Sequence, residues 1–359
     1  MKRKHPPTAN AEILIPHVGW LSFPKDDLVL RYLREGWFEY LEQAFLWLYL
    51  RSSDVVVDGG AHAGLFSALA ARILNQNGRI LSIEPNKLMH KHLQRNLTDA
   101  KASIELLPIA LGENSGKRVL SVGDEAHAAW STVAYDLGYG NSTVVETLSL
   151  NDLFRQANLK HADFVKIDTE GSELPIFRGA ADLLARGKVT MFFVEFTEQN
   201  FQKSGYTSID LSALLLANGY LSFSFDAEQR RIVPRSVHGP IEYENLIFTN
   251  DPESINVRLT KASHEHQRIA AEIIARGQTL TARIRGLEQD GEARLRVIDD
   301  LGFRLQEVEK DREARLGIIE TLGARIREVD EDRAARLAVI ETLTARVRRL
   351  EQELRSLHR

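Results

Sequence analysis

Short β-branched runs alternate with helical segments between residues 54 and 248, and this alternation limits the fold more than any other feature. Strands are expected at 54–57, 79–83, 104–107, 164–167, 189–196, 220–225 and 246–248. Helical spacing falls between them, at 64–74, 87–97, 150–157, 174–186 and 209–218. Strands and helices that alternate at this spacing build βαβ units. We therefore predict an α/β fold with a mostly parallel, doubly wound sheet.

The sequence texture divides the chain into four parts. Residues 1–50 form a lead-in segment with helical spacing from 26 to 49, broken near Gly36, and residues 51–250 form the α/β domain. We expect a linker at 251–275 and a coiled coil at 276–359. No proline follows Pro252, and Phe303 is the one aromatic residue after Phe248, so the last third lacks the composition of a globular core.

The last part is built from repeats. Segments 279–299, 300–320, 321–341 and 342–359 align at a period of 21 residues, with an apolar stripe at heptad spacing. This period predicts a left-handed coiled coil and a homo-oligomer joined through residues 280–357. Gly291, Arg312 and Arg333 interrupt the stripe once in each repeat. The alternative is a single solvated helix, which would leave the stripe exposed.

Composition excludes several classes of function. A net charge of −4, with no basic patch interleaved with aromatic residues, gives no support for nucleic-acid binding. The absence of cysteine excludes disulfides, cysteine-bound zinc and thiol catalysis. The longest apolar run, Ala44 to Leu50, is far shorter than the roughly 20 residues that span a bilayer. We expect a cytoplasmic protein without a membrane span.

A glycine-rich turn follows the first strand of the α/β domain. Glycines at such a turn let a ligand approach backbone N–H groups at a helix N-terminus. A dinucleotide fingerprint would place glycine where Ala61 stands. The acid that ends the strand suits a ligand carrying an ammonium and a sulfonium, such as S-adenosylmethionine. The candidate cofactor residues of this turn are Asp58, Gly59, Gly60, Ala61, His62 and Gly64.

Glu84 ends the next strand. In doubly wound folds an acidic residue at this position accepts hydrogen bonds from the ribose hydroxyls of a nucleotide. Taken alone, Asp58 could equally be a helix cap. The two acids in this strand order favour a cofactor site.

A second group of charged residues lies around the strand at 164–167. Lys166 is within the strand, Asp168 and Glu170 follow it, and Glu195 ends the next strand. Parallel strands bring these residues to one sheet edge, where α/β folds bind ligands. Alternatively, Glu170 and Glu173 are first-turn acids that favour the helix dipole. No histidine spacing indicates a metal site, although a divalent cation held by Asp168 and Glu195 is an alternative.

Several motifs together resemble the FkbM-type methyltransferases. They are Gly36-Trp37-Phe38-Glu39, Asp58-Gly59-Gly60-Ala61-His62-Ala63-Gly64, Ile83-Glu84-Pro85-Asn86, Ile109-Ala110-Leu111-Gly112, Lys166-Ile167-Asp168-Thr169-Glu170-Gly171-Ser172-Glu173 and Phe177-Arg178-Gly179-Ala180, with Glu195. The resemblance covers roughly residues 30–250. It implies a class I methyltransferase (Rossmann-like) fold, S-adenosylmethionine as donor, and O-methylation of a sugar or natural-product hydroxyl. It also adds Pro85, Asn86 and Ala110 to the cofactor candidates.

The sequence departs from the family pattern at Asn151, where the family often has Asp, and the expected acceptor segment at about 121–145 matches no family pattern. We expect a small-molecule or glycan acceptor. Asp168 is the first candidate for the base or substrate anchor, supported by Glu170, Lys166 and Glu195. Two alternatives are an RNA or protein methyltransferase and a coiled-coil scaffold whose catalytic domain is silent.

Overall fold

The computed structural model describes residues 10–36, 38–123, 131–138 and 141–287, and further on residues 312, 322, 323, 325, 330, 333, 334 and 336–351. The chain divides into two compact units, Met1–Leu287 and Glu288–Arg359.

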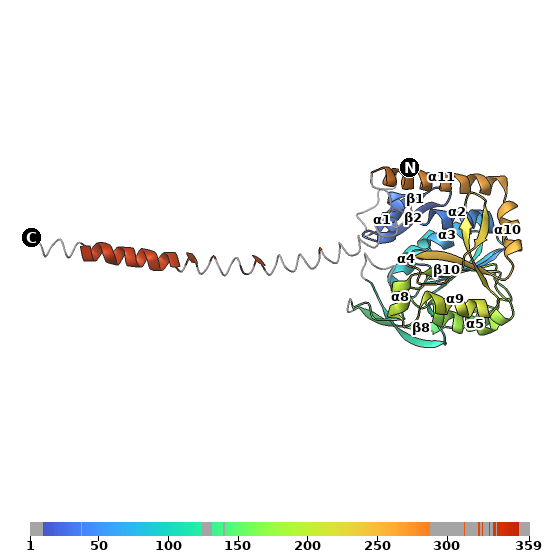
Figure 1. Cartoon of the computed structure of the whole chain (residues 1–359), viewed down its shortest axis with the longest axis horizontal. Coiled ribbons are helices and arrows are strands. Elements are labelled where there is room, and N and C mark those ends of the chain that lie inside the picture. The colour runs from blue at the N-terminus through green and yellow to red at the C-terminus, as the bar shows by residue number, and fades with distance from the viewer. Residues whose placement is uncertain are drawn as a thin grey trace, which may run out of the picture. The chain divides into compact units, whose positions relative to one another are not determined.

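An eight-stranded sheet forms the centre of the first unit (Figure 1). Its order is β12-β11-β13-β10-β9-β3-β4-β5. The strands are β3 (Val55–Gly59), β4 (Arg79–Ile83), β5 (Ser103–Leu107), β9 (Phe164–Ile167), β10 (Met191–Phe196), β11 (Leu221–Asp226), β12 (Arg231–Pro234) and β13 (Glu244–Thr249). The neighbours from β5 to β10 pair in parallel, and β13 runs antiparallel to β10 and β11. The mostly parallel sheet predicted from the sequence is confirmed.

Helices cover both faces of this sheet. They are α1 (Leu28–Glu35), α2 (Tyr40–Tyr49), α3 (Leu65–Ile73), α4 (Lys87–Asn96), α5 (Leu150–Gln156), α6 (Glu173–Arg178), α7 (Ala181–Ala185), α8 (Glu198–Lys203), α9 (Ser208–Ala217), α10 (Pro252–Thr260) and α11 (His264–Leu287). Two small sheets complete the unit, the hairpin of β1 (Asn10–Ile15) with β2 (Gly19–Pro24) and the sheet of β6 (Ala110–Leu111), β8 (Ser142–Leu148) and β7 (Gly116–Ser121).

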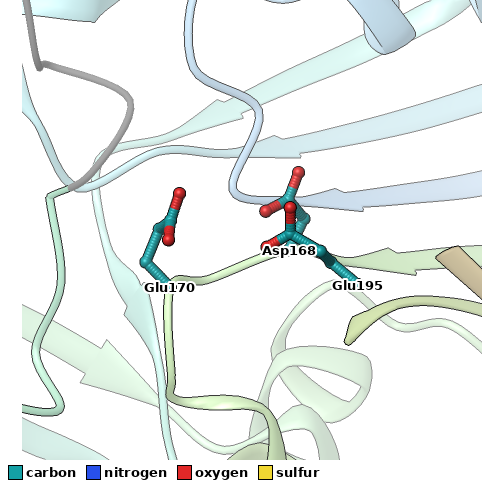
Figure 2. Close-up of side chains that lie close together, drawn as sticks. All are labelled: Asp168, Glu170 and Glu195. Carbon is teal, nitrogen blue, oxygen red and sulfur yellow. The ribbon is translucent and has the colours of Figure 1, made fainter. Parts of the chain in front are cut away.

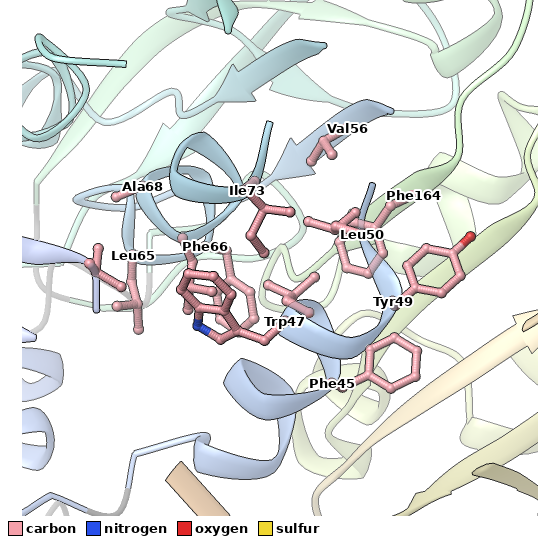
Figure 3. Packing of buried hydrophobic residues seen from close by; sticks show 14 of the residues in the cluster. Phe45, Trp47, Tyr49, Leu50, Val56, Leu65, Phe66, Ala68, Ile73 and Phe164 are labelled. Carbon is pink, nitrogen blue, oxygen red and sulfur yellow. The ribbon is translucent and has the colours of Figure 1, made fainter. Parts of the chain in front are cut away.

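Alternating strand residues divide the core into two apolar layers, because successive side chains of a strand point to opposite faces. Phe193 joins the layer that α2, α3, α10 and α11 cover, part of which Figure 3 shows. Phe192 joins the opposite layer, which is built from α5 to α9. The sheet is therefore buried on both faces, and the polar residues of the candidate site lie at the ends of its strands.

The first fifty residues contain more structure than the sequence predicts. The helical break expected near Gly36 is confirmed, because Gly36 ends α1 in a left-handed conformation with φ of 85°. The hairpin of β1 and β2 was not predicted. Its buried residues Leu21 and Phe23 belong to the same core layer as α3.

The expected linker at 251–275 is wrong. This segment forms α10 and the start of α11, and its residues Ile255, Leu259 and Ile269 are buried in the core. Residues 276–287 continue α11, where a side chain at Gly277 would collide with the Tyr40 ring of α2. The first unit thus extends to Leu287.

The helix expected at 174–186 is also divided. It forms α6 and α7, which are separated at Gly179. A Cβ atom at Gly179 would lie 2.6 Å from the carbonyl oxygens of Gly112 and Glu113. The close approach of that loop accounts for the glycine at the break.

In the second unit, residues 336–351 are helical. Their apolar side chains are between 51% and 57% exposed, at Leu337, Val339, Ile340, Leu343, Val347 and Leu350. Most of the predicted coiled coil lies outside the described residues. Among the described helices of the chain, none is long and apolar enough to cross a membrane.

Candidate active site

The site candidates gather where the strand order reverses. β4 and β9 flank β3 on either side, and all three are parallel. Open α/β sheets bind ligands in the crevice outside the carboxyl ends of such strands. The loops that follow β3 and β9 meet at this position, so it unites the two groups of residues singled out from the sequence.

Gly60 allows these two loops to touch. Its φ is +85°, and a Cβ atom there would lie 1.7 Å from the carbonyl oxygen of Asp168. The N–H groups of Gly60 and Ala61 donate to the carbonyl of Ile83, at 3.0 and 2.9 Å, which ties the turn to the end of β4. The glycine is therefore required by packing between loops, whether or not a ligand is bound.

The other small residues of the turn also meet neighbouring elements. A Cβ atom at Gly59 would lie 2.9 Å from Leu111 Cδ1, and one at Gly64 would lie 2.5 Å from Leu93 Cδ1. Gly64 is the N-cap of α3 in a left-handed conformation, with φ of 90°. Ala110 is buried in β6, outside the turn, and only its neighbour Leu111 reaches Gly59.

Glu84 is a buried acid that organises the end of β4. Its Oε2 accepts the N–H of His62 at 2.8 Å, and its Oε1 accepts the N–H of Asn86 at 2.7 Å. Asn86 caps α4 by accepting the N–H of Leu88, and Pro85 is half-buried between the two residues. Burial raises the pKa of Glu84, and the hydrogen bonds from the N–H groups of His62 and Asn86 lower it. Each oxygen retains acceptor capacity for a ribose hydroxyl, so the residue fits a nucleoside cofactor.

Asp58 is buried at the end of β3. Its Oδ2 accepts the hydroxyl of Ser67, in the first turn of α3, at 2.6 Å. This contact resembles the helix cap considered as the alternative. Its Oδ1 is buried and has no hydrogen-bond partner among the described residues. Because buried polar atoms are normally paired, this oxygen is a second feature that fits a polar ligand.

Asp168, Glu170 and Glu195 come together as the sequence predicts (Figure 2). One carboxylate oxygen from each lies within 4.8 Å of the others. Burial and the neighbouring carboxylates raise the pKa of Glu170 to about 8 and the pKa of Glu195 well above its usual range. At neutral pH Glu170 is therefore mostly protonated, with a smaller ionised fraction. Carboxylate oxygens are also ligands of divalent cations, so the trio could hold one.

Lys166 supplies a buried positive charge beside this trio. Its Nζ lies 2.5 Å from Asp168 Oδ2, and its side chain is 3% exposed. Burial would lower the pKa of Lys166, but the carboxylates of Asp168, Glu39 and Asp58 outweigh burial and raise it. The side chain remains an ammonium, so it serves as a counter-ion to Asp168 and cannot act as a base.

Glu173 belongs to the loop framework. It accepts the N–H groups of Thr169 and Gly171, at 2.8 and 2.9 Å, and the hydroxyl of Tyr206 at 3.1 Å. With 1% of its surface exposed, it fixes the loop that carries Asp168 and Glu170.

The sequence missed several neighbours of the acid trio. Asn200 donates to Glu170 Oε2 at 2.6 Å and accepts the hydroxyl of Tyr135 at 2.9 Å. Tyr135 lies in the expected acceptor segment, of which residues 124–130, 139 and 140 are outside the described residues. No local pattern marks either residue. Glu39 lies in a motif quoted for the family resemblance, and its pKa is raised to about 8, chiefly by burial.

Residues 58–222 match the model of the methyltransferase FkbM domain. A curated relative, methyltransferase sdnD of Sordaria araneosa, is 28% identical over 160 residues. The match covers 36% of this chain and 61% of that protein, so the chain spans less than two thirds of the relative's length.

Two solved structures align with low scores. A TehB-like SAM-dependent methyltransferase from Corynebacterium glutamicum has a TM-score of 0.33 at 12% identity, covering 62% of this chain and 97% of that chain. A SAM dependent methyltransferase from Aquifex aeolicus has a TM-score of 0.34 at 12% identity, covering 62% and 93%. Scores below 0.5 do not establish a shared fold.

The raised pKa of Glu170 predicts a cost in stability at high pH. Its pKa is about 8 in the folded chain against 4.5 for the free group, so the folded chain holds the proton more tightly. Stability from this group is then lost as the pH rises from about 4.5 to about 8. Glu170→Gln, which stays uncharged, should unfold at higher urea concentration than the wild type at pH 8 and at nearly the same concentration at pH 5.

Glu146→Gln is the matched control, because Glu146 lies on β8 with a side chain that is 60% exposed. The difference in urea midpoint between Glu146→Gln and the wild type should be the same at pH 5 and at pH 8. An equal effect of Glu170→Gln at pH 5 and pH 8 would show that the Glu170 proton is not held in the folded chain.

Proposed function

We propose that the chain, whose residues 58–222 match the model of the methyltransferase FkbM domain, is an S-adenosylmethionine-dependent O-methyltransferase. The main support for the proposal is that two loops contact each other. The turn after β3, with Glu84 beside it, lies against the loop that carries Asp168 and Glu170. A cofactor site and a proton-accepting site thus share one crevice.

Glu84 and Asp58 are assigned to the cofactor. Glu84 would accept the ribose hydroxyls, because its two oxygens are held in place by the N–H groups of His62 and Asn86. Asp58 would face the polar end of the cofactor through its unpaired Oδ1. When bound, S-adenosylmethionine supplies a methyl group already activated by a positively charged sulfur.

The acid trio is assigned to the acceptor. A hydroxyl acceptor must lose its proton during methyl transfer, and a carboxylate close to the oxygen can take it. Asp168 is the first candidate to anchor the hydroxyl, because Lys166 fixes its carboxylate in one position. Glu170 is a candidate to accept the proton in its ionised form, since its pKa of about 8 lies near the working pH. Glu195 is a second candidate, because its carboxylate lies beside those of Asp168 and Glu170.

We assign the acceptor to the class of sugar, glycan or natural-product hydroxyls. The support is the family resemblance together with a segment that carries hydroxyl groups and contacts residues of the candidate site. Ser131 accepts from Asn86 at 3.1 Å, and Tyr135 reaches the Asn200 side chain. Uncharged hydrogen-bonding groups of this kind suit a polyhydroxyl acceptor.

We also propose that residues 280–357 join several copies of the chain. Within the described helix at 336–351, Ile340, Leu343, Val347 and Leu350 follow one another at steps of three and four residues. Each is more than half exposed in the single chain. Heptad spacing of exposed apolar residues favours a coiled coil with other copies.

Loss of Glu84 should weaken cofactor binding. Glu84→Ala removes a charged acceptor worth roughly 1.5–3 kcal/mol, so calorimetry should show affinity for S-adenosylmethionine reduced about tenfold or more. Glu105→Ala is the control, because Glu105 lies on neighbouring β5 and pairs with Arg79. Equal affinity in the two variants would refute the cofactor assignment.

Loss of charge at Asp168 should reduce transfer more than cofactor affinity. With radiolabelled donor and a panel of sugar and natural-product hydroxyls, Asp168→Asn should transfer about a hundredfold less methyl than the wild type. Asp182→Asn, on the exposed side of α7, should transfer normally. If Asp168→Asn keeps its activity, Asp168 is structural and Glu170 or Glu195 takes its place.

Truncation should separate the two units. A chain ending at Leu287 keeps α10 and α11 and should sediment as a folded monomer, whereas the full chain should sediment as an elongated oligomer. A chain ending at Asn250 loses Ile255, Leu259 and Ile269 from the core and should unfold. A monomeric full chain at micromolar concentration would contradict the oligomer proposal.

A further inference from the structure

A buried ion pair joins the turn after β3 to the N-terminal part of the chain. His62 Nε2 lies 2.9 Å from Asp27 Oδ2, and the two side chains are 15% and 0% exposed. Neither atom has a hydrogen-bond partner among the described residues, so the contact between them is an ion pair. The charge of each is therefore compensated by the other, and Phe23 of β2 packs against the His62 ring.

Asp27 has two separate tasks. It is the N-cap of α1, where its Oδ1 accepts the N–H of Leu30 at 3.1 Å. Its Oδ2 faces His62. One oxygen of Asp27 thus caps a helix, and the other contacts a side chain of the turn after β3. Asp27 lies 31 residues before the family-matched segment, which begins at residue 58.

His62 connects this acid to Glu84. Its backbone is in the left-handed region with φ of 52°, which directs the side chain to Asp27 while the N–H donates to Glu84 Oε2. Burial would lower the pKa of His62, but Asp27, Glu84 and Asp168 outweigh burial and raise it. The positive charge of His62 in turn lowers the pKa of Glu84, which burial raises.

The two nearby histidines of α4 contact groups other than Asp27. His92 on α4 contacts the Ser22 hydroxyl through Nδ1 at 2.9 Å, and burial lowers its pKa to about 4, so it is neutral near pH 7. His90 on α4 contacts the Glu84 carbonyl. Among the described residues, the acids that act on the charge of His62 are thus Asp27, Glu84 and Asp168, and His92 is a neighbouring histidine.

We propose that Asp27 is a positioning residue for the cofactor: it keeps His62 charged and fixed, and His62 keeps Glu84 ionised to accept the ribose hydroxyls. The inference rests on the proposed function, because it assumes that Glu84 binds the nucleoside. It extends the cofactor site to the segment formed by β1, β2 and α1, which lies outside the matched family domain. That segment then supports the chemistry and is more than a lead-in.

The test is Asp27→Asn, with Asp26→Asn as its matched control. Asparagine is as good an N-cap as aspartate, so α1 should persist while the charge facing His62 is lost. Asp26 is the adjacent residue and is exposed. Affinity for S-adenosylmethionine is measured by calorimetry between pH 5.5 and 8.5 for the wild type and both variants.

The wild type and Asp26→Asn should give one pH profile, whereas Asp27→Asn should bind roughly fivefold more weakly at pH 7, because the Glu84 acceptor is weakened rather than removed. Affinity is lost as the pH falls and Glu84 takes up its proton. Without Asp27 the pKa of His62 falls, so His62 loses its charge at a lower pH. Glu84 then lacks a positive neighbour over that pH range and is protonated at a higher pH. The acid limb of the Asp27→Asn profile should therefore shift to higher pH.

A second readout needs no cofactor. The titration midpoint of His62, followed by NMR of the unliganded chain, should fall in Asp27→Asn and stay unchanged in Asp26→Asn. If Asp27→Asn does not fold, His62→Asn carries the test, since asparagine tolerates the left-handed backbone and keeps the N–H. It should show the same weaker, pH-shifted binding.

The outcomes separate the two proposals. A wild-type chain that fails to bind S-adenosylmethionine refutes the proposed function and the inference with it. A wild type that binds, together with an Asp27→Asn variant of equal affinity, equal profile and equal His62 midpoint, overturns the inference alone. A lower midpoint without any change in binding likewise overturns it, because the charge of His62 would then not reach the cofactor site.

Discussion

The buried ammonium of Lys166 is the charge on which the site depends. It lies 3% exposed in β9, within 2.5 Å of Asp168, and the carboxylates of Glu39 and Asp58 also stabilise it. Burying several acids at one sheet edge is costly unless a positive charge compensates them. Lys166 provides that charge from within β9. Glu170 and Glu195, further from it, keep raised pKa values.

The two halves of the site are packed together as one unit. Gly60 lets the turn after β3 contact the carbonyl of Asp168, and Glu173 fixes the loop that carries Asp168. On the other side, His62 links the same turn to Glu84 and to Asp27. The groups that we propose for cofactor and acceptor thus lie on loops anchored at strand ends, an arrangement that suits a reaction in which alignment supplies most of the rate enhancement.

The sequence predicts what depends on local pattern and on the geometry of parallel strands. β4 begins and ends at the predicted residues, and Asp168, Glu170 and Glu195 meet because neighbouring parallel strands end at one edge. Contacts between distant segments leave no local signal. Asp27 lies far from His62 in sequence. In α10 and α11 apolar residues alternate with charged and polar ones, so their burial in the core could not be read from their own pattern.

We propose that one site, at the ends of β3, β4 and β9, binds the cofactor beside the acid trio. A crystal structure with S-adenosylhomocysteine, the product left after transfer, tests this most directly. The ribose hydroxyls should lie within hydrogen-bond distance of the Glu84 carboxylate, with the sulfur turned toward Asp168, Glu170 and Glu195. A nucleoside bound away from Glu84, or a sulfur turned away from the three acids, would contradict the account.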